Sequence, residues 1–229
     1  MSIYLQPNYL LFLKNEKKTL NFLMNSPIIN KLYNEIAVSA STSFYNLPTK
    51  DTVLTTVNFI FGCHFDLQVE GLVRRMVIEA KVEKKFISSS YVLSMCENNE
   101  SPFSLIRKFH FDYALPDTTA PKPVYHLQYG GKSTPILTNL EIDTKGLQPW
   151  LSDPRICLYP INLALLLDSI FSGFRSNETN QITNSSEWRG LIKENEDFLL
   201  KPFYNKFYQF INNGHKSDYL IRDYYNGKV

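Results

Sequence analysis

The chain has 229 residues and a formal net charge of +2, with 44% hydrophobic and 20% charged residues. This composition excludes a disordered chain, and the length allows one domain with a full hydrophobic core. The small net charge does not indicate a nucleic-acid-binding protein, and the glycines form neither a dinucleotide-binding fingerprint nor a phosphate-binding loop.

The sequence carries no targeting signature and no thiol-based site. Its three cysteines, Cys63, Cys96 and Cys157, lie far apart and form no C-x-x-C pair, which argues against a zinc ribbon or a dithiol redox site. Residues 1–24 contain no long apolar run, and the run at 163–167 is far too short to cross a bilayer. We therefore expect a cytoplasmic protein that does not act at a membrane.

Residues 1–62 are predicted to form helices. Apolar residues between 7 and 24 recur on one helical face. Pro27 after Ser26 indicates the start of a second helix, whose apolar stripe continues to residue 44. A third element is expected at 49–61, where β-branched residues reduce the preference for a helix until it only slightly exceeds that for a strand.

Residues 72–130 are predicted to form an antiparallel sheet. From residue 73 apolar side chains alternate with polar ones, and further strands are expected at 87–96, 104–113 and 123–129. The connections are too short for helical crossovers, so the four strands should form a meander.

The rest of the chain is predicted to be a long loop at 131–159, helices at 160–214 and a tail at 215–229. Leu163, Leu166, Leu167, Ile170, Phe171 and Phe174 predict an inward stripe on the first of these helices. A polar, mobile segment is expected at 175–185, followed by a capping box from Asn184 to Glu187 and a helix after Pro202 that ends near Gly214. The whole chain, 1–229, is expected to be a single α+β domain, with its four-stranded meander packed by N-terminal and C-terminal helices.

Two predicted strands carry the most informative side chains. By strand alternation, the 104–113 strand places His110 and Asp112 on one face, and the 123–129 strand places His126 and Gln128 on one face. If the strands pair, these polar groups converge, and the opposite face carries Phe109, Phe111, Leu127 and Tyr129 against a core made largely by the 160–174 helix.

Three interpretations of this cluster stay open. It can be a hydrogen-bonded ladder that fixes strand register, or a binding patch. It can also be a catalytic or metal site with His110, Asp112 and His126 as ligands. The last interpretation predicts a divalent metal ion and hydrolysis of phosphodiesters; the others need no cofactor. His110 and Asp112 also match the first part of an iron-binding facial triad, with His215 and Arg222 as distal partners.

Basic residues offer a second type of contact. Arg107 and Lys108 belong to a group that could meet phosphates, although a solvated sheet face is the simpler interpretation and Glu79 and Glu83 interrupt the group. Its other members are Arg74, Arg75, Lys81, Lys84 and Lys85. Arg155 could hold a carboxylate or phosphate, or pair with Asp153 or Asp168. The H-F-D string at 64–66 repeats part of the strand motif, but Gly62 beside it predicts a loop.

The motifs F-H-F-D-Y at 109–113 and Y-H-L-Q-Y-G-G at 125–131, the Pro154-Arg155 step and the hydrophobic helix resemble a family of uncharacterised prokaryotic proteins. Such proteins tend to be encoded near mobile elements and phage-defence or toxin genes. The resemblance covers about a third of the chain, residues 91–174. It implies no activity and marks only His110, Asp112, His126, Gly130, Gly131 and Arg155.

No complete catalytic signature is present, while 16 Phe and 14 Tyr residues provide many aromatic side chains of the kind enriched at interfaces. We therefore expect a non-enzymatic accessory or sensor protein of a defence, toxin or mobile-element system. It would bind a protein partner encoded in the same operon, with nucleic acid as a further partner.

Overall fold

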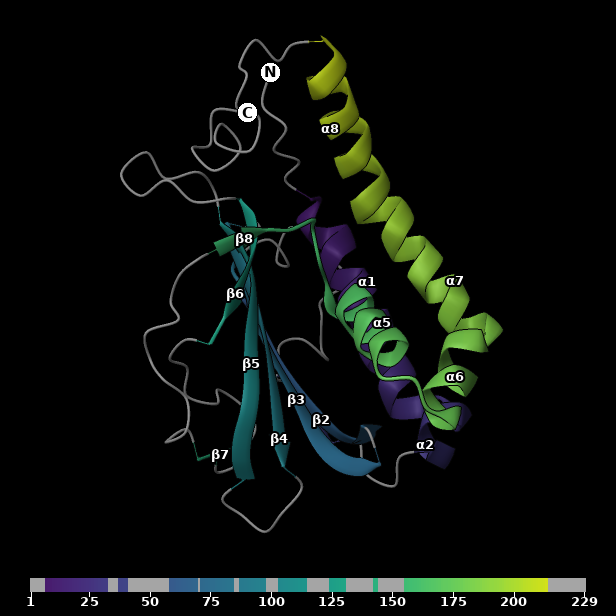
Figure 1. Cartoon of the computed structure of the whole chain (residues 1–229). Coiled ribbons are helices and arrows are strands. Elements are labelled where there is room, and N and C mark those ends of the chain that lie inside the picture. The colour runs from purple at the N-terminus through teal and green to yellow at the C-terminus, as the bar shows by residue number, and fades with distance from the viewer. Residues whose placement is uncertain are drawn as a thin grey trace.

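The computed structural model describes residues 7–32, 37–40, 58–69, 71–84, 87–97, 103–114, 124–130, 142–143 and 155–213. In these residues the chain has an α+β fold, with helices layered on one face of a largely antiparallel sheet (Figure 1). The strands are β1 (Ala37–Ala40), β2 (Phe59–Val69), β3 (Leu72–Val82), β4 (Ser88–Glu97), β5 (Phe103–Ala114), β6 (Tyr125–Tyr129), β7 (Ile142–Asp143) and β8 (Arg155–Cys157).

Five consecutive strands, β2 to β6, form an antiparallel meander in which each strand pairs with the next. The predicted α+β class and antiparallel meander are confirmed, although the sheet is larger than the four strands expected. Its order is β1-β2-β3-β4-β5-β6-β8, and the short β7 pairs with β5 in parallel. β7 and β8 lie within 131–159, so the prediction of an uninterrupted loop there is wrong.

Strand β2 corrects two predictions. Residues 59–61 form a strand and not the slightly favoured helix, and residues 64–66 belong to the same strand and not to a loop. The rest of the predicted element, 49–57, lies outside the described residues. Its odd-numbered side chains, Phe61, Cys63, Phe65 and Leu67, are buried, as an alternating strand on a core requires. It pairs with β3 along its full length, from Phe59 opposite Val82 to Val69 opposite Leu72. The 1–62 segment is therefore not helical throughout.

The first predicted helix, at 7–24, is confirmed. It is α1 (Tyr9–Asn25), which begins after Asn8, whose side chain accepts a hydrogen bond from Leu11 N at 3.1 Å. Pro27 begins α2 (Pro27–Leu32), as expected, but residues 37–40 are extended in β1 instead of helical, and residues 33–36 and 41–44 of the predicted helix lie outside the described residues. β1 pairs with β2, which would otherwise present an unpaired edge, so tertiary pairing overrides the helical stripe.

The C-terminal helices are α5 (Leu163–Gly173), α6 (Asn177–Asn184), α7 (Ser186–Asn195), the π-helical turn η2 (Glu196–Leu200) and α8 (Lys201–Asn213). The expected mobile segment at 175–185 is thus wrong: Ser176 caps α6, and Ile182 anchors it in the core. The predicted capping box is also displaced, because the cap of α7 is Ser185, which accepts from Trp188 N at 3.2 Å. The predicted tail at 215–229 lies outside the described residues.

Pro202 lies in the first turn of α8, directly after η2. Proline has no backbone N–H and cannot donate to the preceding turn, which fits a local π turn at this point. Figure 1 shows α7, η2 and α8 following one another along the outside of the helical layer.

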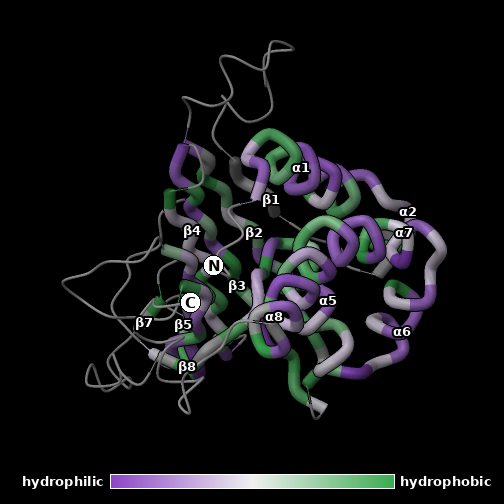
Figure 2. The backbone as a smooth tube through the Cα atoms, turned by 90° about the horizontal axis from the view of Figure 1, so that it is seen from above, coloured by the Kyte–Doolittle hydropathy of each residue, from purple (hydrophilic) through white to green (hydrophobic). Residues whose placement is uncertain are grey.

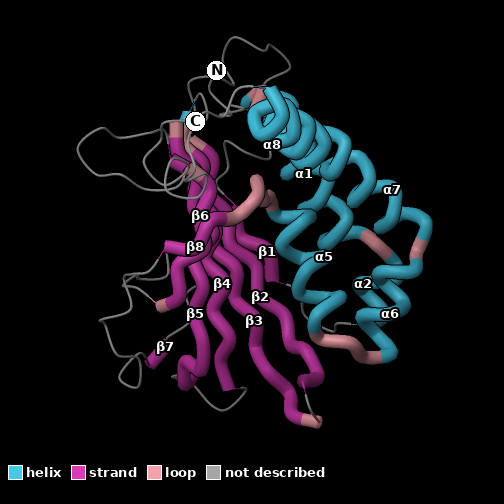
Figure 3. The backbone as a smooth tube through the Cα atoms, turned by 45° about the horizontal axis from the view of Figure 1, so that its top comes forward, coloured by secondary structure: helices cyan, strands magenta, loops and turns pink. Residues whose placement is uncertain are grey.

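The core lies between the sheet and the helices. Figures 2 and 3 show the helices together on one side of the strands. The Trp188 ring lies 5.1 Å from the ring of Phe22 on α1 and 5.5 Å from that of Phe171 on α5. Phe171 in turn lies 5.7 Å from Phe65 on β2, so one chain of rings connects three helices with the sheet.

Among the described helices, none combines the length and the hydrophobicity that spanning a bilayer requires.

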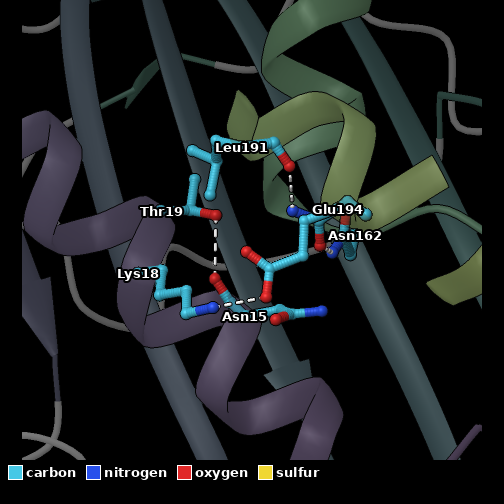
Figure 4. A network of polar contacts seen from close by, with 7 residues as sticks. Asn15, Lys18, Thr19, Asn162, Leu191 and Glu194 are labelled. Carbon is cyan, nitrogen blue, oxygen red and sulfur yellow. Dashed lines mark hydrogen bonds and ion pairs between the residues drawn. The ribbon is translucent and has the colours of Figure 1, made fainter. Parts of the chain in front are cut away.

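Polar contacts tie α1, α5 and α7 together, and Figure 4 shows those around Lys18, Asn162 and Glu194. The buried Glu16 carboxyl group accepts a hydrogen bond from Leu163 N at 3.1 Å, and burial raises its pKa to about 8. Asn162 accepts from Leu165 N at 3.1 Å and donates to Asn195 Oδ1 at 2.5 Å. Lys18 of α1 also pairs with Glu194 of α7.

Replacing Asn162 with alanine is expected to lower the free energy of unfolding by about 1–3 kcal/mol. The substitution removes the cap of α5 and leaves the buried Asn195 amide without its donor. Chemical denaturation measures the loss. Asn180→Ala, at an exposed position of α6, is the matched control, and an equal effect of both substitutions would contradict the role assigned to Asn162.

Candidate functional site

The predicted polar cluster forms on the face of β5 and β6 that points away from the helices. His110 lies directly opposite Gln128, and Asp112 lies directly opposite His126. The two strands are adjacent and antiparallel, and both histidines share one face, as predicted. Phe109 opposite Tyr129 and Phe111 opposite Leu127 occupy the other face.

The helix-facing row is only partly covered. Phe109 and Phe111 pack against the core, whereas Tyr129 is 36% exposed. Phe203 of α8 places its ring 5.8 Å from Tyr125 on β6, so α8 as well as α5 covers this sheet.

The polar face continues across the neighbouring strands in two rows. One row runs from Lys81 through Ser90 and Asp112 to His126. The next runs from Glu79 through Val92, His110 and Gln128 to Arg155 on β8. The register therefore brings five predicted site residues into adjacent rows: His110, Asp112, His126, Gln128 and Arg155. The Arg155 side chain lies outside the described part of the structure.

An open pocket of about 360 Å³ lies over the first row. This volume is within the range of small-molecule sites, about 300–1,000 Å³. Lys81, Ser90, Asp112 and His126 line it, with Ser88 and Gln128 beside them. Of the lining, only Asp112, His126 and Gln128 were predicted site residues. Lys81 was expected in the basic group, and Ser88 and Ser90 were missed, although their place on alternating strands was a usable signal.

The ionisable side chains of this face are partly shielded from solvent. Asp112 Oδ2 lies 3.6 Å from His126 Nε2. Asp112 Oδ1 and His110 Nε2 are buried and make no hydrogen bond within the described structure. Burial lowers the pKa of His110, the nearby Lys108 lowers it further, and Asp112 opposes both. His110 is therefore a neutral imidazole at neutral pH.

The geometry gives little support to the catalytic interpretations. Among the residues that the structure describes, no three His, Cys, Asp or Glu side chains are arranged to hold a metal ion. Asp112 meets His126, but His110 lies in the next row opposite Gln128. Asp112 also lies between Ser90 and His126, whereas nucleophilic catalysis needs the imidazole beside the serine. The distal facial-triad residues, His215 and Arg222, fall outside the described ranges.

The predicted basic group is largely engaged by carboxylates. Arg75 makes two hydrogen bonds to Asp66, at 2.8 and 3.0 Å, and its guanidinium lies 4.6 Å from the centre of the Phe103 ring. Arg74 pairs with Glu97, and Lys81 with Glu83, each at 3.5 Å. These pairs weaken the nucleic-acid interpretation. Lys85 is outside the described residues.

Arg107 and Lys108 lie on opposite faces of β5. Arg107 is exposed and lies opposite Met95, on the same face as Phe109. Lys108 is buried on the polar face, where burial lowers its pKa and Glu79 raises it. The two side chains therefore do not form a joint binding patch.

A second candidate surface, missed in the sequence, lies on α8. Tyr204, Tyr208 and Ile211 are 50%, 69% and 46% exposed, and their spacing places them on one stripe of the helix. The buried Phe203 and the half-buried Phe207 stack with their ring centres 6.2 Å apart. Because α8 is apolar on more than one side, its sequence does not show which face is covered.

No protein-family model, curated protein or solved structure matches this chain. The fold and the candidate surfaces therefore provide the arguments for function.

Proposed function

We propose that the chain is a non-enzymatic accessory or sensor protein that acts by binding a protein partner through α8. The observation that carries this proposal is the exposed stripe of Tyr204, Tyr208 and Ile211 on a helix already anchored by Phe203. Aromatic side chains provide large contact areas and are enriched among residues that dominate binding energy. The setting in a prokaryotic defence, toxin or mobile-element system, with the partner encoded in the same operon, rests on the resemblance of the two strand motifs.

The stripe also indicates what the partner offers. Residues spaced four and three apart on a helix suit an apolar groove in another protein. Helix α8 itself contains no acidic residue, but its Lys201 already pairs with Asp197 of η2. The charges beside the stripe therefore do not select the partner, and an apolar groove is what the stripe fits. The proposed occupant is a different protein, and self-association is the alternative outcome of the test.

Tyr208→Glu is expected to weaken partner binding by about 100-fold. A carboxylate would replace the most exposed ring of the stripe and would be desolvated in the partner's apolar groove. The free energy of unfolding should change by less than about 0.5 kcal/mol, because the position is on the surface. Calorimetric titration with the purified operon-encoded partner measures the affinity.

Gln209→Glu is the matched control, since it adds the same charge at the next exposed position of α8. It should reduce affinity far less than Tyr208→Glu. Equal affinity of Tyr208→Glu and wild type would contradict the proposal. Concentration-dependent dimerisation of the chain that Tyr208→Glu abolishes would identify a second copy as the occupant instead.

A further inference from the structure

The Asp112 carboxylate is an unusual feature of the sheet pocket. Its Oδ1 atom is buried and accepts no hydrogen bond in the described structure. Its Oδ2 atom has only the long, 3.6 Å contact with His126 Nε2, and that contact is an ion pair only if the imidazole is protonated. A partly buried carboxylate with so few partners is unfavourable, so this group calls for a compensating donor.

The other charges of the pocket do not supply that compensation. Lys81 and Glu83 also line it, and they pair with each other at 3.5 Å. Asp112 is thus a carboxylate of the pocket that no lysine or arginine of the described residues holds in an ion pair, and its side chain is 24% exposed. The hydroxyl of Ser90, directly opposite Asp112, and the amide of Gln128 lie at the same wall, and each can accept a hydrogen bond from a ligand.

We propose that this pocket binds a small organic cation whose ammonium or guanidinium group donates hydrogen bonds to Asp112. Such a group supplies both the positive charge and the N–H donors that the carboxylate lacks, and charge-assisted hydrogen bonds are the strong ones. A divalent metal fits less well, because Asp112 and His126 are only two ligands and no third completes a set among the described residues. This site is on the sheet, away from α8, and is independent of the proposed partner docking.

The Asp112 carboxylate is expected to lower the stability of the empty protein and to provide affinity for the cation. In the empty pocket, Asp112→Asn removes an unbalanced charge, so this variant should fold and melt at the same temperature as the wild type or above it. With the cation bound, the order should reverse, because a ligand that binds only the folded protein stabilises it.

Isothermal titration of the full chain with agmatine, which carries both cationic groups, tests the proposal. The wild type is expected to bind agmatine saturably, and Asp112→Asn should weaken binding by about tenfold or more, as expected for a lost charged hydrogen bond. At the same concentration, agmatine should also raise the melting temperature of the wild type more than that of Asp112→Asn. Butane-1,4-diol, a neutral probe, should not bind.

Asp66→Asn is the matched control. It removes a carboxylate from the same face of the sheet, but one that Arg75 already holds through two hydrogen bonds. This variant should bind agmatine within about twofold of the wild type, because distant sites act independently. Absence of saturable binding, equal affinity in Asp112→Asn, or equal binding of the diol would overturn the proposal.

Discussion

Replacing Trp188 with alanine is expected to lower the free energy of unfolding by about 3–5 kcal/mol, the usual loss for a large aromatic core residue. The side chain is 1% exposed and contacts Phe22 and Phe171, which belong to two other helices. Its Nε1 atom donates a hydrogen bond to Asp168 Oδ1 at 2.8 Å. Truncation therefore opens a cavity where three helices meet. Urea denaturation followed by circular dichroism measures the loss.

Trp188→Phe separates the packing of this ring from its hydrogen bond. It keeps much of the ring volume and should lose about 2–3 kcal/mol, the contribution of a hydrogen bond to a charged group plus some packing. Arg189→Ala, one residue along on the exposed side of α7, should be nearly neutral. A loss below about 1 kcal/mol for Trp188→Ala would contradict the central position assigned to this ring.

Glu16→Gln is expected to stabilise the protein at neutral pH and to make its free energy of unfolding less dependent on pH. Burial raises the pKa of Glu16 from 4.5 to about 8 in the folded chain. Between these values the unfolded state releases the proton and the folded state retains it, so stability falls as pH rises, by up to about 1.4 kcal/mol per pH unit. The stability that Glu16 contributes through its raised pKa is fully present below the pKa of the unfolded state, and it is lost as pH rises to the pKa of the folded state.

Glutamine stays neutral at every pH and keeps an oxygen for Leu163 N, so the variant should gain roughly 3 kcal/mol over the wild type at pH 7. Cys63 lies near Glu16 but does not titrate in this range, because burial raises its pKa to about 12. Urea denaturation from pH 5 to pH 8 measures the effect, with the exposed Glu194→Gln as control. Parallel pH profiles of Glu16→Gln and the wild type would contradict a protonated Glu16.

The strands with clear alternation were predictable from the sequence. β3 to β6 were located to within a few residues, because an alternating strand that is half buried has a period-two pattern of its own. β2 shows the same alternation in Phe61, Cys63, Phe65 and Leu67. It was missed because Gly62 and the polar residues between the apolar ones were read as signs of a loop.

Elements defined by their neighbours were not predictable. β1 is four residues long and depends on pairing with β2, and α6 is a polar helix held by the burial of Thr179 and Ile182. The site residues on β5 and β6 were predictable, because alternation within each strand shows which side chains share a face. Lys81 and Ser90 were not, because their position beside Asp112 depends on the register of β3 and β4. The lack of hydrogen-bond partners at Asp112 depends on atomic positions that no local sequence pattern contains.

The hydrogen bond between Glu16 and Leu163 joins residues 147 positions apart, and the ion pair between Lys18 and Glu194 joins residues 176 apart. A ribosome adding about 5–20 residues per second would need roughly 7–30 s to produce the first of these partners after α1 has been made. Throughout that time Phe12, Leu13 and Leu20, which are buried in the finished protein, have no C-terminal helices to cover them. During synthesis α1 is thus a nascent segment that chaperones can bind, and the last helices to be translated end that exposure.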